Sequence, residues 1–181
     1  MSGHSKWSKV KHQKATTDVV KSFAFTKASH AITVAVKEGG GITDPVSNFH
    51  LRLAVEKAHA VNMPKENIER AIAKAAGEGA AAIEQIMYEG YGPGGVAILI
   101  HAATDKRQRT VSQIKNVLER AGGTLVSPGG VNFLFERRGT IIEPKQGMGI
   151  ALNEEQKRRT DALIKELEEL DDVQTVFTNL L

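Results

Sequence analysis

The chain has no cysteine, few prolines and few aromatic residues among its 181 residues. Without cysteine it forms neither disulfides nor thiolate metal sites, and thiol catalysis is excluded. No run of 18 apolar residues occurs, which excludes a transmembrane helix, and the polar N-terminus lacks the apolar stretch of a secretory signal. With 41% hydrophobic and 25% charged residues, the composition is that of a folded globular protein. The sequence predicts a cytoplasmic protein with no membrane partner.

Signatures of catalysis and cofactor binding are absent as well. The segment Gly90–Gly95 matches G-x-G-x-x-G, but a strand follows it and Pro93 removes an amide donor, so we interpret it as a hairpin turn. No Walker A sequence, G-x-S-x-G motif or paired-histidine zinc motif occurs. The acidic clusters, including Asp171-Asp172, are interpreted as a solvated face. We therefore expect no enzyme, no cofactor and no metal, and we identify no small-molecule substrate.

The positive charge is concentrated near the N-terminus. The net charge is +3, yet residues 1–37 hold seven lysines against Asp18 as the single acidic residue. A basic end on a near-neutral body favours contact with a polyanion, and nucleic acid before a membrane.

Residues 1–79 predict a basic arm followed by a helical domain. Residues 1–16 have no apolar periodicity and are interpreted as the arm. Helical spacing of apolar residues predicts helices from about 17 to 37 and from 47 to 61, and a third that starts at Pro64. Gly39–Gly41 ends the first helix. Three such helices with short connections form a small bundle, and Ala80–Ala82 marks the domain junction.

Residues 80–181 predict strands and helices. We expect strands at 86–91, 96–101, 131–135, 140–142 and 173–177, and helices at 110–121 and about 154–170. Thr110 and Asn153 each begin a capping-box sequence. With strand 86–91 as an extra one in front, the order of the others is that of a ferredoxin-like split βαβ domain. The predicted fold class is therefore α+β, an N-terminal three-helix bundle followed by a ferredoxin-like domain.

Two basic clusters are candidate nucleic-acid contacts. Lysines neutralise phosphates, and an exposed aromatic ring can stack on a base. The alternatives are a solvated tail for the first cluster, with Trp7 as a packing anchor, and ordinary surface arginines for the second, where Asp105 offsets part of the charge. The candidate residues are Lys6, Trp7, Lys9, Lys11, His12, Lys14 and Lys27 in the first region and Lys106, Arg107 and Arg109 in the second.

Several segments together resemble the YebC/PmpR family. They are Gly3–Trp7, Val10–Lys14, Phe25–Lys27, Gly39–Gly41, Asn62–Lys65, Ile68–Ile72, Tyr88–Ala97, Thr104-Asp105 with Arg109-Thr110, Phe135–Gly139 and Asp171–Gln174.

The resemblance implies a cytoplasmic, non-catalytic regulator of gene expression. Members are described as transcriptional regulators that bind DNA, while others act in translation, at the ribosome or on messenger RNA. The family's basic N-terminal motif corresponds to the residues from Lys6 to Lys14. Typical members insert a third domain after the strand near Ile142, where this chain has only residues 143–152. We expect this short connection to be mobile and both domains to fold without the third.

Overall fold

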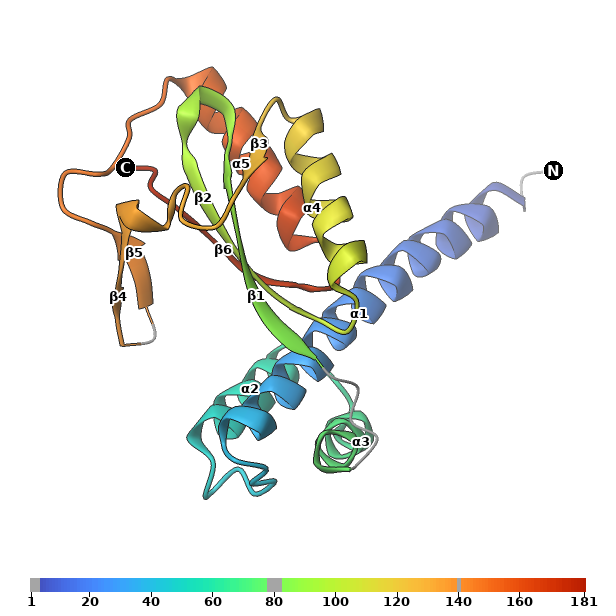
Figure 1. Cartoon of the computed structure of the whole chain (residues 1–181). Helices are drawn as coiled ribbons and strands as arrows, with labels where there is room; N and C mark the ends of the chain where they lie inside the picture. Colours follow the sequence, from blue (N-terminus) through green and yellow to red (C-terminus); the bar gives the residue numbers. More distant parts are fainter. Residues whose placement is uncertain (1–3, 78–82, 140) are drawn as a thin grey trace. The chain divides into compact units, whose positions relative to one another are not determined.

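The computed structural model describes the backbone of residues 4–77, 83–139 and 141–181, and side chains from residue 21 onward. The chain divides into two compact units, Met1–Ala80 and Ala81–Leu181. The first contains three helices, and the second contains a sheet with helices (Figure 1). The predicted α+β fold class is confirmed.

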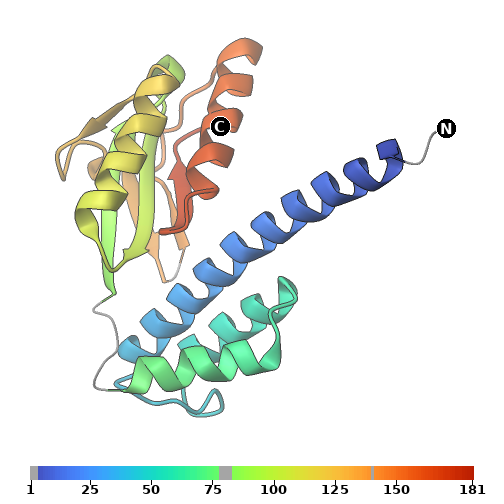
Figure 2. The same cartoon turned by 90° about the vertical axis from the view of Figure 1, so that its right-hand side faces the viewer.

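The first unit consists of α1 (His4–Glu38), α2 (Phe49–Ala60) and α3 (Lys65–Ala76). Their predicted apolar faces form its core, and alanine is frequent there, so the helices approach closely. Within this unit α1 extends well past the ends of α2 and α3 (Figure 2). Its described core residues begin only at Phe25. The buried core residues are Ala28, Ile32, Ala35, Val36, Leu51, Ala54, Ala58, Met63, Ile68, Ala71 and Ala75.

The start of α1 corrects the sequence prediction. We expected an irregular arm over residues 1–16, but the helix begins at His4 and continues without interruption to Glu38. No glycine or proline lies between these residues, and lysine, alanine and glutamine favour helix even without an apolar face. Periodicity therefore detected only the part of the helix that has an apolar face in the sequence.

The connection between α1 and α2 is organised around Asn48. Its side-chain oxygen accepts the Leu51 N–H at 3.0 Å and so caps α2, while its amide nitrogen donates to Ala35 O and Ile42 O, each at 3.0 Å. Asn48 is buried, with 3% of its surface exposed. One side chain thus fixes the start of α2 against the end of α1.

The second unit is built on a four-stranded antiparallel sheet with the order β3-β1-β2-β6. The strands are β1 (Glu84–Tyr91), β2 (Ala97–Thr104), β3 (Thr124–Val126) and β6 (Val173–Thr178). Helices α4 (Arg107–Arg120) and α5 (Glu154–Glu168) lie together beside the sheet (Figure 1). Because β2 and β3 are each antiparallel to β1, the segment β2–α4–β3 is a split βαβ unit with β1 between its strands.

The membership of this sheet differs from the prediction. Strand 86–91, expected as an extra one, is β1, one of the two inner strands of the sheet, and β3 was missed. The predicted strands at 131–135 and 140–142 correspond to η2 (Asn132–Leu134), β4 (Phe135–Arg138) and β5 (Ile141–Pro144). β4 and β5 pair with each other as a separate hairpin. Short apolar runs reveal strands, but strand pairing depends on contacts that are distant in sequence.

The hairpin and the loop before it cover part of the sheet face opposite the helices. Phe135 and Val131 are buried there against Ala97 and Leu99 of β2. Glu89 of β1, 6% exposed, accepts the N–H groups of Gly129, Val131 and Asn132 at 2.7, 2.7 and 2.8 Å, while the Tyr91 hydroxyl donates to Gly130 O at 3.0 Å. Glu89 and Tyr91 of β1 therefore hold the loop 127–134 against the sheet.

Two further predictions concern the turn at Gly90–Gly95 and the start of α5. The turn is a hairpin connection through η1 (Pro93–Gly95), with Gly94 at φ 73°, as expected. Asn153 caps α5 in a complete capping box with Gln156, also as expected. Thr110 does not cap α4, because that helix begins three residues earlier at Arg107 and has no side-chain cap.

Candidate nucleic-acid interface

The first candidate cluster lies in the N-terminal half of α1. The backbone there is helical, while the side chains of Lys6, Trp7, Lys9, Lys11, His12 and Lys14 lie outside the described residues. On a helix that rises 1.5 Å per residue, the four lysines from Lys6 to Lys14 span only about 12 Å. An extended arm would spread them over about 27 Å. The helix therefore more than doubles the linear charge density of this segment.

The basic character continues along the described part of α1. Lys21 is exposed, and Lys27 is half-buried and engaged with a neighbouring group. No acidic residue occupies the first turn of the helix. Phosphate contacts of this helix would therefore come from residues before Phe25, where the described packing against α2 and α3 begins.

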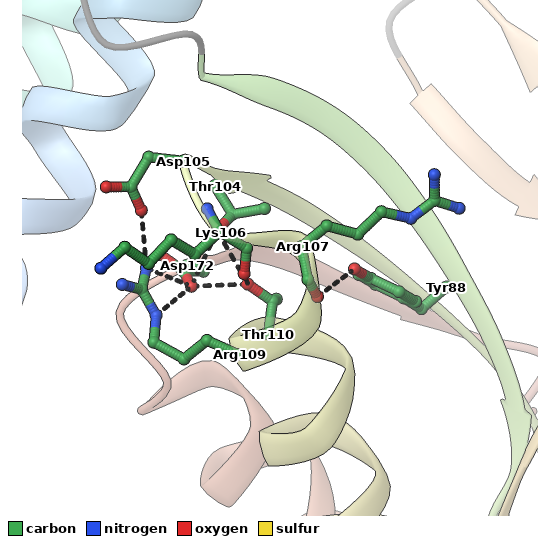
Figure 3. Close-up of polar contacts among 8 residues, drawn as sticks. All are labelled: Tyr88, Thr104, Asp105, Lys106, Arg107, Arg109, Thr110 and Asp172. Carbon is green, nitrogen blue, oxygen red and sulfur yellow. Dashed lines mark hydrogen bonds and ion pairs between the residues drawn. The ribbon is translucent and has the colours of Figure 1, made fainter.

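The second cluster lies where β2 ends and α4 begins, and a buried carboxylate organises it. Asp172, 1% exposed, accepts the Thr110 hydroxyl at 2.6 Å and the Thr104 hydroxyl at 3.1 Å (Figure 3). Arg109 donates to it through Nη2 at 2.9 Å to both oxygens and through Nε at 3.3 Å. Arg109 also pairs with Asp105 at 2.9 Å. A single carboxylate thus ties the start of α4 to the start of β6.

These contacts set the ionisation of the pair. Burial raises the pKa of Asp172, but hydrogen bonds from Thr110 and Arg109 and the charge of Arg109 outweigh it, so the pKa lies below the ordinary aspartate value. The hydrogen bond from Arg109 to Asp172 is the largest cause that raises the pKa of Arg109. Both groups are therefore charged at neutral pH.

The three basic residues of this cluster have different surroundings. Arg109 is engaged by the carboxylates of Asp105 and Asp172, and 41% of its side chain is exposed. Lys106 and Arg107 are exposed. Their backbone is fixed, because the Lys106 N–H donates to Thr104 Oγ1 at 2.9 Å and the Tyr88 hydroxyl donates to Arg107 O at 3.4 Å (Figure 3). Two cations therefore project from a rigid helix start.

Sequence reasoning missed Asp172. We grouped it with a solvated acidic run, and for this residue that interpretation is wrong. Its partners Thr104, Arg109 and Thr110 lie more than 60 residues earlier in the chain. The available signal was an acidic residue directly before an apolar strand, together with a basic and hydroxyl-rich segment between another strand and a helix.

Neither a metal-binding cluster nor a membrane-spanning helix is found among the described residues. Within them, no group of three His, Asp or Glu side chains is placed to hold a metal ion. Across the same part of the chain, no helix combines the length and apolar character needed to cross a bilayer.

Comparison with known proteins decides the family. Residues 5–78 match the model described as TACO1/YebC protein N-terminal domain, and residues 83–150 match the TACO1/YebC second and third domain. This chain belongs to the TACO1/YebC family. The resemblance seen in the sequence is thereby confirmed.

Individual relatives of this family cover nearly the whole chain. A "Probable transcriptional regulatory protein" of Chlorobaculum parvum is 48% identical over 183 residues, 99% of this chain and 71% of the relative. A protein of the same name from Roseiflexus castenholzii is 44% identical over 190 residues, with the same two coverages. The crystal structure of the conserved hypothetical protein Aq1575 from Aquifex aeolicus has a TM-score of 0.77 and 31% identity. The match covers 88% of this chain and 90% of that one.

Proposed function

We propose that this chain is a cytoplasmic regulator of gene expression that binds nucleic acid, with DNA as its target, and that it catalyses no reaction. The observation that carries the proposal is the lysine-rich first half of α1. Four lysines within nine residues of uninterrupted helix present a dense positive charge of the kind that replaces counterions on phosphates. The names of the two relatives, as transcriptional regulatory proteins, agree with this assignment.

The second unit adds a smaller basic contribution. Lys106 and Arg107 stand at the start of α4, where the backbone N–H groups and the helix dipole favour an anion. The contacts of Asp172 and Arg109 keep these two residues in place without using their side chains. Contacts of these two cations with phosphates would position the protein on nucleic acid and carry no sequence information by themselves.

A binding titration of the full chain tests the proposal. Labelled duplex DNA and RNA of equal length are titrated at several salt concentrations and followed by fluorescence anisotropy. We expect binding at low salt whose affinity falls linearly on a plot of log K against log salt. The absence of binding to either polymer at low salt would contradict the proposal.

The nature of the target requires a separate experiment, because translation is the alternative within this family. The protein is followed through a density gradient of cell extract before and after nuclease digestion of the RNA. A DNA-binding regulator stays out of the ribosome fractions in both runs. If the protein sediments with ribosomes and nuclease abolishes this co-sedimentation, the target is RNA and not DNA.

A further inference from the structure

The sheet face opposite α4 and α5 is covered only in part. The part of this face around Ala97 and Leu99 is buried under Val131, Phe135 and their neighbours. Farther along the central strands, Met87 and His101 stand directly opposite each other, and Thr175 of β6 is opposite His101 on the other side. These three side chains are half-buried. They share this face because their neighbours Tyr88 and Ile100 belong to the core on the helix side.

His101 holds a fixed place in this face. Its Nε2 lies 2.8 Å from Oε1 of Gln85, which is on the same face of β1. The ring is therefore oriented by a hydrogen bond and is flanked by the side chains of Met87 and Thr175. An oriented, partly exposed aromatic ring on a central strand is a surface on which an unstacked base can lie.

The β4–β5 hairpin adds a cation to the same side. Arg137 is paired in register with Ile142, whose side chain packs with Phe135 against this sheet face. Cross-strand partners share a face of the hairpin, so Arg137 lies on the side turned to the sheet. It is exposed, and among the described residues it forms no ion pair.

The carboxylates of this region are already used. Glu136 and Glu143 lie on the other face of the hairpin, where both pair with Arg138. Glu89, which belongs to the same sheet face, is buried and accepts three backbone N–H groups. The carboxylates of Glu89, Glu136 and Glu143 are therefore engaged elsewhere, and the positive charge of Arg137 is complementary to a phosphate.

We propose that this face, formed by Gln85, Met87, His101, Thr175 and Arg137, binds single-stranded nucleic acid. His101 stacks on a base and Arg137 contacts a backbone phosphate. The inference rests on the proposed function and specifies one mode of it, because bases that remain stacked inside a duplex cannot lie on a sheet face.

Four variants of the full chain test the inference, with single-stranded RNA, single-stranded DNA and duplex DNA of one sequence as probes. Arg137→Gln should flatten the plot of log K against log salt for single strands by about 0.7. His101→Ala should weaken single-strand binding about five-fold or more, the loss of one stacked base, and His101→Tyr should restore it. Arg138→Gln, on the other face of the hairpin, is the matched control and should bind normally. Duplex binding should be unchanged in all four.

The outcomes separate this inference from the proposed function. If Arg137→Gln and His101→Ala bind single strands as tightly as the natural chain does, the sheet face is not a binding surface, even though α1 still binds nucleic acid. If both variants weaken single-strand and duplex binding equally, the single-strand mode is wrong. If the natural chain binds no probe, the proposed function is wrong, and the inference that rests on it is wrong as well. Equal losses on RNA and DNA single strands support recognition without the 2′-hydroxyl.

Discussion

Replacing the buried carboxylate of Asp172 by its amide should destabilise the second unit alone. Asp172→Asn keeps the volume but removes the charge and places an NH2 group among donors from Thr104, Thr110 and Arg109. Each lost hydroxyl hydrogen bond costs about 1 kcal/mol. The side chain of Arg109 is 41% exposed, so water compensates part of that pair and we assign it about 1 kcal/mol. The expected loss in the free energy of unfolding is about 2–3 kcal/mol.

The two units can be followed separately. Both tyrosines, Tyr88 and Tyr91, belong to β1 and report on the second unit. In urea, the tyrosine near-UV signal of Asp172→Asn should unfold at a midpoint about 1–2 M lower than that of the natural chain. Hydrogen exchange at the amides of α2 and α3, which belong to the first unit, should not change. The control is Asp161→Asn, which removes the same charge from an exposed position of α5 in the same unit as Asp172.

The lowered pKa of Asp172 predicts how the stability of the second unit depends on pH. Because the pKa of Asp172 is lowered in the folded state, its charged form stabilises the fold above the unfolded-state pKa, near 3.8. This contribution is lost as the pH falls through the folded-state pKa. The stability difference between the natural chain and Asp172→Asn should be constant from pH 7 to 5 and shrink below about pH 4. A difference that is absent at pH 7, or equal in Asp161→Asn, would refute the role assigned to Asp172.

Three other predictions concern the backbone of the second unit. Gly94→Val should destabilise it by about 1–3 kcal/mol, since Gly94 has φ 73° and a Cβ would lie 2.7 Å from Leu152. Urea unfolding measures this loss. If the folded fraction of the variant no longer bound nucleic acid, the turn would not be purely structural. Glu89→Gln should speed hydrogen exchange at the amides of Gly129, Val131 and Asn132, with α4 unchanged; equal exchange in both proteins would show that Glu89 does not hold the loop. In the connection 145–152, the Ile150 amide should exchange slowly, because it donates to Asn179 O at 2.8 Å, whereas fast exchange along the whole connection would support the mobility expected from the sequence.

The sequence predicted those features whose causes are local. Helical periodicity found the faces that carry Ile32, Leu51 and Ile68, because each repeats within one helix. Glycines identified the end of α1 and the turn at Gly94, where φ is positive. The capping box at Asn153 was equally local.

The features that escaped the sequence depend on distant contacts or on the absence of a pattern. The first half of α1 is helical without an apolar face, so periodicity gave no signal there. The inner place of β1 follows from pairing with β2 and β3 on either side. The burial of Asp172 depends on Thr104 and Thr110, which only the folded sheet brings to it. Of the candidate site, composition indicated the cations, and the fold added the ion pairs of Arg109 with Asp105 and Asp172.

The central claim is that the lysine-rich first half of α1 supplies the main contact with nucleic acid. Its most direct test is the salt dependence of duplex DNA binding by a variant in which Lys6, Lys9, Lys11 and Lys14 are all alanine. The matched control replaces four exposed lysines of α2, α3 and α4, namely Lys57, Lys65, Lys74 and Lys115, and so removes the same charge. The slope of log K against log salt should flatten by about 3–4 in the first variant and much less in the control. An unchanged slope in the first variant, or equal flattening in both, would contradict the claim.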